Sequence, residues 1–170
     1  MALRGLSADR LAQTENILKS DILTIREARI MSEPANCIFC KIVRGSIPAI
    51  KVHEDDDTLT FMDIQPASPG HALVIPKIHA ANLMEIADAD LSAATRAVQR
   101  VARAVRKALA PDGIRIVQTN GKAAGQTVFH YHVHIIPMQE GQKVGTHGRA
   151  PANPEELKAL AARIRDALDN

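Results

Sequence analysis

Residues 126–137 read Gln-Thr-Val-Phe-His-Tyr-His-Val-His-Ile-Ile-Pro, and here three histidines alternate with apolar residues. Side chains alternate between the two faces of a β-strand, so His130, His132 and His134 are expected on one face. On a helix the same residues would scatter around the axis, and the β-branched and aromatic residues between the histidines favour a strand. The stretch therefore predicts a strand that presents three imidazoles on one face.

A turn with two glycines precedes this strand, at residues 120–125 (Asn-Gly-Lys-Ala-Ala-Gly). Such a turn can bring backbone N–H groups close to an anion. Imidazoles beside an anion-binding turn indicate acid–base or nucleophilic chemistry on a phosphate, because a purely structural strand has little need for three imidazoles on one face.

The histidine stretch resembles the His-x-His-x-His-x-x signature of the histidine triad (HIT) family, in which each x is apolar. Upstream segments resemble the family in the same order; they are residues 37–42, 45–49, 61–64 and 69–79. The similarity covers about residues 36–138, and it is closest to the Hint-like branch that bears a zinc site.

Composition limits the alternatives. The chain has 170 residues with 46% hydrophobic residues, which suggests one domain with a modest core, and no run of ~18 apolar residues predicts a membrane span. A net charge of +2 and 2% aromatic residues argue against a nucleic-acid partner. The first thirty residues mix acidic and basic side chains, unlike a signal or transit peptide. Together with two cysteines spaced Cys-x-x-Cys, this predicts the cytoplasm.

The expected fold is α+β, with one long helix and a five-stranded, mainly antiparallel sheet built from sequential hairpins. The strands are expected at residues 50–54, 58–64, 71–76 and 114–120 and in the histidine stretch, and the helices at residues 88–110 and from Asn153 onward. Residues 35–140 would form the catalytic domain, between an N-terminal helical extension (1–34) and a C-terminal loop and helix (141–170). Met31 shortly precedes the first family-like segment, so the first thirty residues are either a real arm or precede the natural start.

Cys37 and Cys40 could be metal ligands, a redox pair or two structural cysteines, and their spacing alone leaves these open. The resemblance implies zinc, because zinc-bearing members add the His of a Pro-Lys-x-His segment and the first His of the triad. Those residues here are His79 and His130. Such a site would be closed and structural, and it would not activate water.

By the same resemblance, His132 is the nucleophile, and it would form a covalent nucleotidyl intermediate that water then cleaves. A neutral imidazole suits this task because it avoids charge repulsion with the phosphate. His134 would contact a phosphate oxygen, and His130 would orient the nucleophile or bind zinc. If His130 binds zinc, only one ring nitrogen is left, which argues against a role as proton donor to the leaving group.

The resemblance also implies a nucleotide site. Asp63 would accept hydrogen bonds from the ribose hydroxyls, since a carboxylate can accept from two hydroxyls at once. The α-phosphate and the bridging atom would be bound by Asn120, Gln126 and Thr127, with Gly125 and Val128 beside them. The apolar slot for a purine base would consist of Ile38, Phe39, Ile42, Phe61 and Ile64. His71 is expected to be a hydrogen-bonded core histidine or to support the site from behind, and His147 an exposed loop residue.

Within the family, the preferred activity is hydrolysis of purine nucleoside phosphoramidates or related AMP conjugates by a homodimer whose sheets join edge to edge. Fhit-like cleavage of dinucleoside polyphosphates is the alternative. A transferase is disfavoured because its third triad residue would be Gln, whereas His134 is His. A nucleotide-binding regulatory protein with incidental hydrolysis is a further alternative. Animal Hint proteins carry a Trp near the C-terminus that reaches the active site of the partner subunit. This chain has no Trp, so the resemblance does not define its selectivity for the leaving group.

Overall fold

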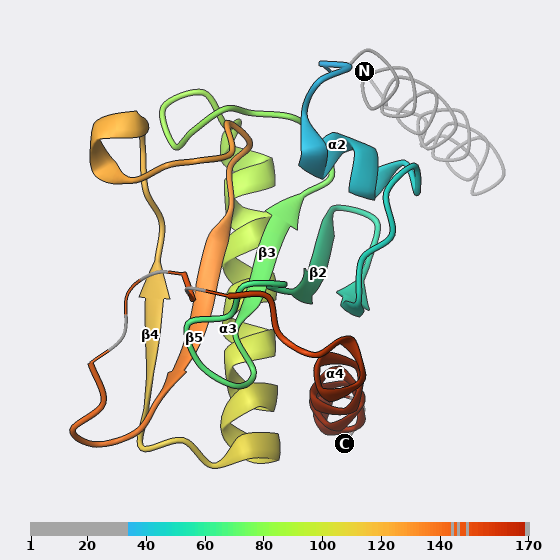
Figure 1. Cartoon of the computed structure of the whole chain (residues 1–170). Helices are drawn as coiled ribbons and strands as arrows, with labels where there is room; N and C mark the ends of the chain where they lie inside the picture. The colour runs from blue at the N-terminus through green and yellow to red at the C-terminus, as the bar shows by residue number, and fades with distance from the viewer. Residues whose placement is uncertain (1–33, 144, 146, 149, 169–170) are drawn as a thin grey trace, which may run out of the picture. The chain divides into compact units, whose positions relative to one another are not determined.

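The computed structural model describes residues 34–143, 145, 147–148 and 150–168 (Figure 1). The predicted N-terminal extension and the alternative start at Met31 lie, apart from Pro34, outside these residues. The helices are α2 (Ile38–Val43), α3 (Asp88–Leu109), α4 (Pro154–Leu168) and the 3₁₀ turn η1 (Lys122–Ala124). The strands are β1 (Lys51–Glu54), β2 (Thr58–Met62), β3 (Ala72–Pro76), β4 (Gly113–Val117) and β5 (Val133–Met138). No helix in the described ranges has both the length and the apolar character of a membrane-spanning segment.

The five strands form one antiparallel sheet in the order β1-β2-β3-β5-β4, which confirms the α+β fold. The expected series of sequential hairpins is wrong. After β3 the chain runs through α3 and returns as the outer strand β4, and β5 then inserts between β3 and β4 (Figure 1). Burial explains this order, because β3 is buried along its whole length and β5 nearly so, whereas β4 has no buried residue and suits an edge.

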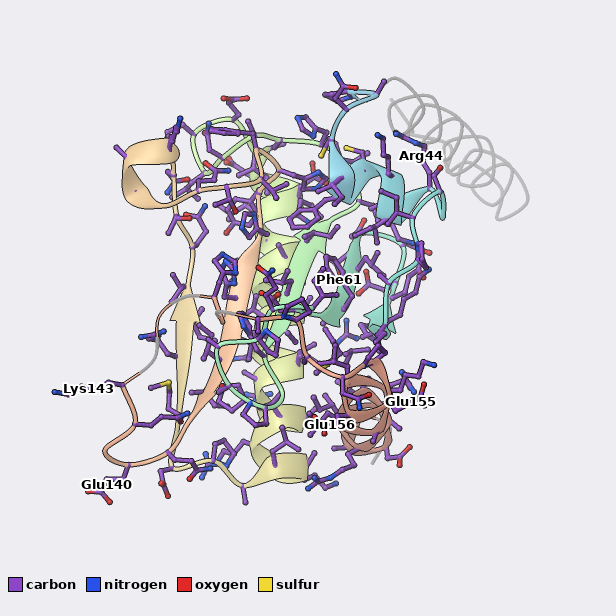
Figure 2. The ribbon with its side chains drawn as sticks, viewed as in Figure 1. Arg44, Phe61, Glu140, Lys143, Glu155 and Glu156 are labelled. Carbon is purple, nitrogen blue, oxygen red and sulfur yellow. The ribbon has the colours of Figure 1, made fainter. Side chains whose placement is uncertain are left out.

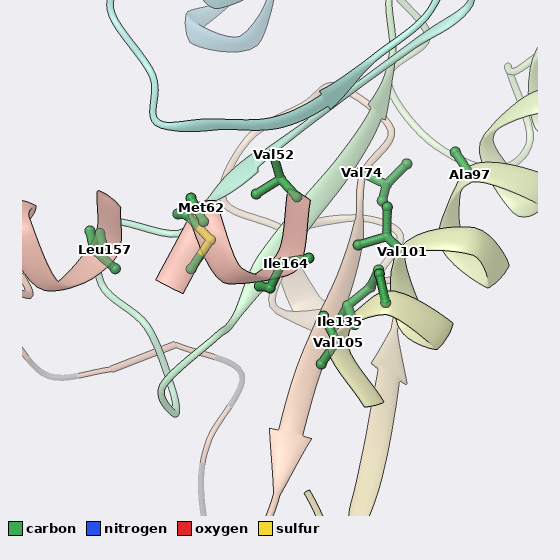
Figure 3. Close-up of a cluster of buried hydrophobic side chains, with 11 residues drawn as sticks. Val52, Met62, Val74, Ala97, Val101, Val105, Ile135, Leu157 and Ile164 are labelled. Carbon is green, nitrogen blue, oxygen red and sulfur yellow. The ribbon is translucent and has the colours of Figure 1, made fainter. Parts of the chain in front are cut away.

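Helices α3 and α4 build the main core on one face of the sheet. The helix α3 packs against β2, β3 and β5, and α4 packs against α3, β1 and β2. The start of α4 is the predicted one: Pro154 is its first residue, and Asn153 Oδ1 caps the Glu155 N–H at 2.8 Å. Figure 3 shows the side chains that meet there, which include Met62, Val74, Val101, Val105, Ile135, Leu157 and Ile164. The C-terminal helix is therefore part of the core that supports the sheet.

The short helix α2, which the sequence pattern did not predict, covers the opposite face. Its Phe39 and Ile42 pack against alternate residues of the central strands, namely Leu59, Phe61, Leu73 and Ile75. Their neighbours Met62 and Val74 belong to the main core, as the period of two along a strand requires. Since Leu73 pairs with His134, this second face is also the one that carries the histidines.

Candidate active site

The three triad histidines lie together, although only His134 belongs to β5. His130 and His132 precede the strand, so the predicted strand over the whole stretch is too long. The ladder between β3 and β5 ends at Val133 because β3 finishes at Pro76, which has no N–H to donate. The rings nevertheless remain neighbours: those of His132 and His134 are 5.0 Å apart, and Phe39 contacts both His130 and His132 edge-on.

Hydrogen bonds define the tautomer of His132. Its Nδ1 lies 2.6 Å from the carbonyl oxygen of His130. Because a carbonyl can only accept, the proton is on Nδ1, and Nε2 carries the lone pair. Burial lowers the pKa of His132 below its usual value, with a smaller opposing effect from that bond, so the ring is neutral near pH 7. Such an imidazole has the electronic form of a nucleophile.

The tautomer of His134 follows from its partner His71. The Ala67 N–H donates to His71 Nδ1 at 3.0 Å, so the proton of His71 is on Nε2, which donates to His134 Nδ1 at 3.0 Å. The remaining proton of His134 is therefore on Nε2, where it can be donated to a phosphate oxygen. Burial is the main cause that lowers the pKa of His71 to about 4 and that of His134 to about 3. His71 thus supports the triad from behind, one of the two roles expected for it.

Acid is expected to destabilise the fold through this histidine pair. In the unfolded chain both groups titrate near pH 6.5, whereas in the folded chain their pKa values are about 4 and about 3. The unfolded chain therefore binds these protons first. The stabilisation is complete above about pH 6.5 and is lost as pH falls toward about 4, at about 1.4 kcal/mol per proton for each pH unit.

Urea unfolding of the chain between about pH 7.5 and 4.5 measures this loss, with a chelator present so that metal release does not contribute. The His71→Gln variant should reduce the slope by the contribution of one proton, because His71 is one of four buried histidines with lowered pKa values in the described residues; the others are His130, His132 and His134. An unfolding midpoint that stays constant over this range would contradict the expectation.

A second cluster joins Cys37, Cys40, His79 and His130, whose candidate ligand atoms all lie within 4.8 Å of one another. Cys40 Sγ is 3.3 Å from His79 Nδ1, and both sulfurs are 3.5 Å from His130 Nδ1. Zinc bonds of about 2.0–2.3 Å give tetrahedron edges of about 3.3–3.8 Å, so these separations suit a tetrahedral ion. The donor set is also the one that zinc prefers. The four predicted metal ligands are thus brought together in a geometry that fits zinc.

Both nitrogens of His130 are committed in this arrangement. Its Nε2 donates to the Pro76 carbonyl at 2.9 Å, which leaves the Nδ1 lone pair directed at the two sulfurs. Burial lowers the pKa of His130 to about 4, so the ring is neutral, as a ligand must be. Since the Nε2 proton is bonded to Pro76 and Nδ1 faces the sulfurs, this arrangement leaves His130 no ring N–H for a leaving group.

An apolar cavity of about 490 Å³ adjoins the triad. Its walls include every residue expected to hold the base, together with two from the loop before β5; they are Ile38, Phe39, Ile42, Phe61, Ile64, Thr127 and Val128. The ring of Phe39 meets that of Phe61 edge-on, with ring centroids 5.5 Å apart, and Ile64 is 67% exposed; Figure 2 labels Phe61. A cavity of this size and character can accept a planar base.

The glycine turn is arranged differently from the prediction. The N–H groups of Gly121, Ala124, Gly125 and Gln126 are all hydrogen-bonded within the turn, so they do not point at an anion. The side chain of Gln126 is buried, and its amide donates to the carbonyls of Ala81 and Val128 while its oxygen accepts from Gly121. Gln126 therefore holds the loop through its side-chain amide. Asn120 likewise binds Gln118 and the Leu83 N–H.

Asp63 lies at the end of β2 beside the cavity and is 6% exposed. Its Oδ1 accepts from the Gln65 N–H at 2.8 Å, and its Oδ2 is 3.2 Å from His147 Nδ1. His147 is the exposed loop residue that was predicted, with its side chain 36% exposed, and the contact with Asp63 is an addition that the sequence did not indicate. Its ring also lies 4.8 Å from that of His134. Asp63 and His147 are 84 residues apart in the sequence, so no local sequence pattern could have predicted their contact.

Known proteins match this sequence. A model of the HIT domain matches residues 44–141. The adenosine 5'-monophosphoramidase hnt1 of Schizosaccharomyces pombe is 45% identical over 136 residues, which cover 78% of this chain and 98% of that protein.

Two crystal structures resemble the fold closely. One is a Hit-like protein from Bartonella henselae (TM-score 0.76, 44% identity, 79% of this chain and 98% of that one). The other is a zinc-bound histidine triad family protein from Mycobacterium smegmatis (TM-score 0.70, 38% identity, 79% and 94%). Together with the triad and the metal cluster, these matches confirm the resemblance that the sequence carries, and the chain belongs to the HIT family.

Proposed function

We propose that this protein is a nucleotide hydrolase that cleaves purine nucleoside phosphoramidates or related AMP conjugates. The observation that carries the proposal is the state of His132: its Nδ1 proton is committed to a carbonyl, and its buried ring is neutral. The name of the fission yeast relative, an adenosine 5'-monophosphoramidase, supports the choice of substrate.

In the proposed reaction, His132 Nε2 attacks the α-phosphorus, and the bond from phosphorus to the leaving nitrogen breaks as that nitrogen takes a proton from solvent and departs as the amine. Water then cleaves the phosphorus–nitrogen bond to His132 and releases AMP. The Nε2–H of His134 donates to a phosphate oxygen and offsets the charge that develops there. Asp63 accepts from the ribose hydroxyls, and the base occupies the cavity between Phe39 and Phe61.

Zinc held by Cys37, Cys40, His79 and His130 has a structural role in this proposal. It ties α2, which supplies Phe39 and Ile42 to the cavity, to the segment that carries the nucleophile. The ion supplies no chemistry to the reacting phosphate, because four protein ligands close its coordination shell.

The proposal includes a homodimer in the cytoplasm. Among the residues that the structure describes, no strand pairs with the outer edge of β4, and Ile116 there is 47% exposed, so a second copy can extend the sheet at this edge. Light scattering after size exclusion should give twice the chain mass for the wild type and the single mass for Ile116→Asp. Equal masses for the two proteins would contradict the proposal that β4 forms the dimer interface.

The experiment that tests the function compares AMP release from adenosine 5'-phosphoramidate with release from diadenosine tri- and tetraphosphate. The proposal expects the phosphoramidate to be cleaved faster by a factor of at least about 100, which corresponds to about 3 kcal/mol in the barrier. Faster cleavage of the polyphosphates would assign the chain to the Fhit-like alternative. Tight AMP binding without any turnover would instead favour a regulatory protein.

A further inference from the structure

His147 reaches the proposed active site from the segment between β5 and α4. Its Nδ1 lies 3.2 Å from Asp63 Oδ2, and its ring lines the same cavity as Asp63 and Phe61. Its ring is 4.8 Å from the ring of His134 and 6.3 Å from that of His71. His147 is thus placed between the carboxylate proposed for the ribose and the imidazole proposed for the phosphate.

Backbone contacts hold this segment in place on both sides of His147. The guanidinium of Arg115 on β4 donates to the Gly145 carbonyl. The Gly148 N–H donates to the Gln65 carbonyl at 2.7 Å, and the Ala152 N–H donates to the Ile64 carbonyl at 3.0 Å. The segment is therefore bonded to the residues that directly follow Asp63.

Gly148 permits this approach because it has no side chain. A Cβ at this position would lie 2.3 Å from the Pro66 carbonyl oxygen, well inside van der Waals contact. The close packing of Gly148 is what brings its neighbour His147 onto Asp63.

The hydrogen bonds at Asp63 show what His147 does there. Oδ1 is held by the Gln65 N–H. His71 Nδ1 is 3.5 Å from Oδ2, but it already accepts the Ala67 N–H and has no proton to give. Within the described part of the chain, His147 is therefore the side chain that donates to Oδ2. An ionised carboxylate has about four acceptor positions, so two remain for a pair of hydroxyls.

We infer that His147 is a positioning residue for the nucleotide: it fixes the Asp63 carboxylate so that its free lone pairs meet the 2'- and 3'-hydroxyls of a ribose. The inference rests on the proposed function. The C-terminal segment thus supplies a selectivity element for ribonucleotides from the same chain.

The test is a thermodynamic cycle that combines the residue with the hydroxyls. Calorimetry measures the Kd of AMP and of 2',3'-dideoxy-AMP for the wild type, His147→Ala and His147→Gln. Loss of the hydrogen bond to a charged group should weaken AMP binding about tenfold in His147→Ala, while binding of the dideoxy nucleotide changes less than about twofold. His147→Gln should recover part of the AMP affinity, because its amide can donate to Asp63.

Two further variants separate this role from a general effect of the loop. Gly148→Ala should reproduce the loss of ribose selectivity while the imidazole is still present, because its Cβ displaces the segment. Lys143→Ala, in the same segment but with an exposed side chain that projects outward in Figure 2, should leave both Kd values unchanged.

The inference is overturned if His147→Ala binds AMP more tightly, since His147 would then compete with the ribose. It is also overturned if both nucleotides weaken equally, which would indicate a structural role. AMP release from the phosphoramidate by the wild type tells the two proposals apart. If the wild type releases AMP but the cycle fails, only the role of His147 is rejected and the proposed function stands. If the wild type binds neither nucleotide, both proposals fall.

Discussion

Replacement of His132 by alanine is expected to lower kcat for AMP release from adenosine 5'-phosphoramidate by about 10⁴-fold or more. Loss of a nucleophile removes the covalent route, and single substitutions of this kind cost up to about 10⁶-fold in well-studied hydrolases. His132 is buried beside Phe39, and its Nδ1 bond to the His130 carbonyl leaves Nε2 as the reacting atom. No other histidine in the described residues shares this combination of a carbonyl-bound Nδ1 and a ring next to His134.

The measurement pairs kinetics with trapping. Wild-type protein mixed with substrate and quenched at high pH should carry a nucleotidyl adduct on the peptide that contains His132, and the variant should carry none. AMP binding by the variant should remain within about fivefold of the wild type, which shows that the site is folded. His53→Ala on β1, outside the site, is the matched control and should keep full activity. Activity of His132→Ala within tenfold of the wild type would refute the proposed mechanism.

Loss of the zinc site is expected to have the largest effect on stability. Cys40 is fully buried, and its sulfur contacts both His79 and His130. A metal that binds only the folded state adds about 4 kcal/mol when its free concentration is 1,000 times its Kd. For a chain of this size each kcal/mol corresponds to about 2–4 °C in Tm. Cys40→Ala should therefore abolish zinc binding and lower Tm by about 10 °C.

Elemental analysis gives the zinc content, which should be one ion per chain in the wild type, and calorimetric melting gives Tm. A chelator should lower the Tm of the wild type to about that of the variant, and added zinc should restore only the wild type. Because the cluster anchors α2, KM for the phosphoramidate should also rise while the His132 adduct still forms. A wild-type chain that purifies with no zinc and melts identically with and without a chelator would argue for two structural cysteines instead.

Several elements were predictable because the physical signal is local. The apolar period along residues 88–109 and the Asn153-Pro154 start of α4 are contained within a few turns of chain, and both helices form where expected. The Cys and His ligands and the apolar cavity residues followed from the family resemblance, and they meet as it implied.

Other elements had no such signal. The helix α2 is too short, at six residues, to show a period. The insertion of β5 between β3 and β4 depends on which strands are buried on both faces, and the assignment of Gln126 depends on carbonyls that come from distant loops. In each case the competing arrangements have the same local sequence and differ only in what the chain meets in space.

The three alternating imidazoles, the paired thiols and the mixed helix–strand pattern are properties of short stretches, and short stretches are enough to indicate phosphate chemistry, a metal cluster and an α+β fold. The protonation states of the active-site histidines, in contrast, are not determined by any short stretch of sequence. Nδ1 of His132 and Nε2 of His71 carry their protons because a carbonyl, an N–H and a second ring lie within hydrogen-bond distance. The pairing of His147 with Asp63 likewise exists because folding closes 84 residues of chain onto one cavity. A hydrogen bond depends on distance and direction, and for partners far apart in the chain these are set by packing.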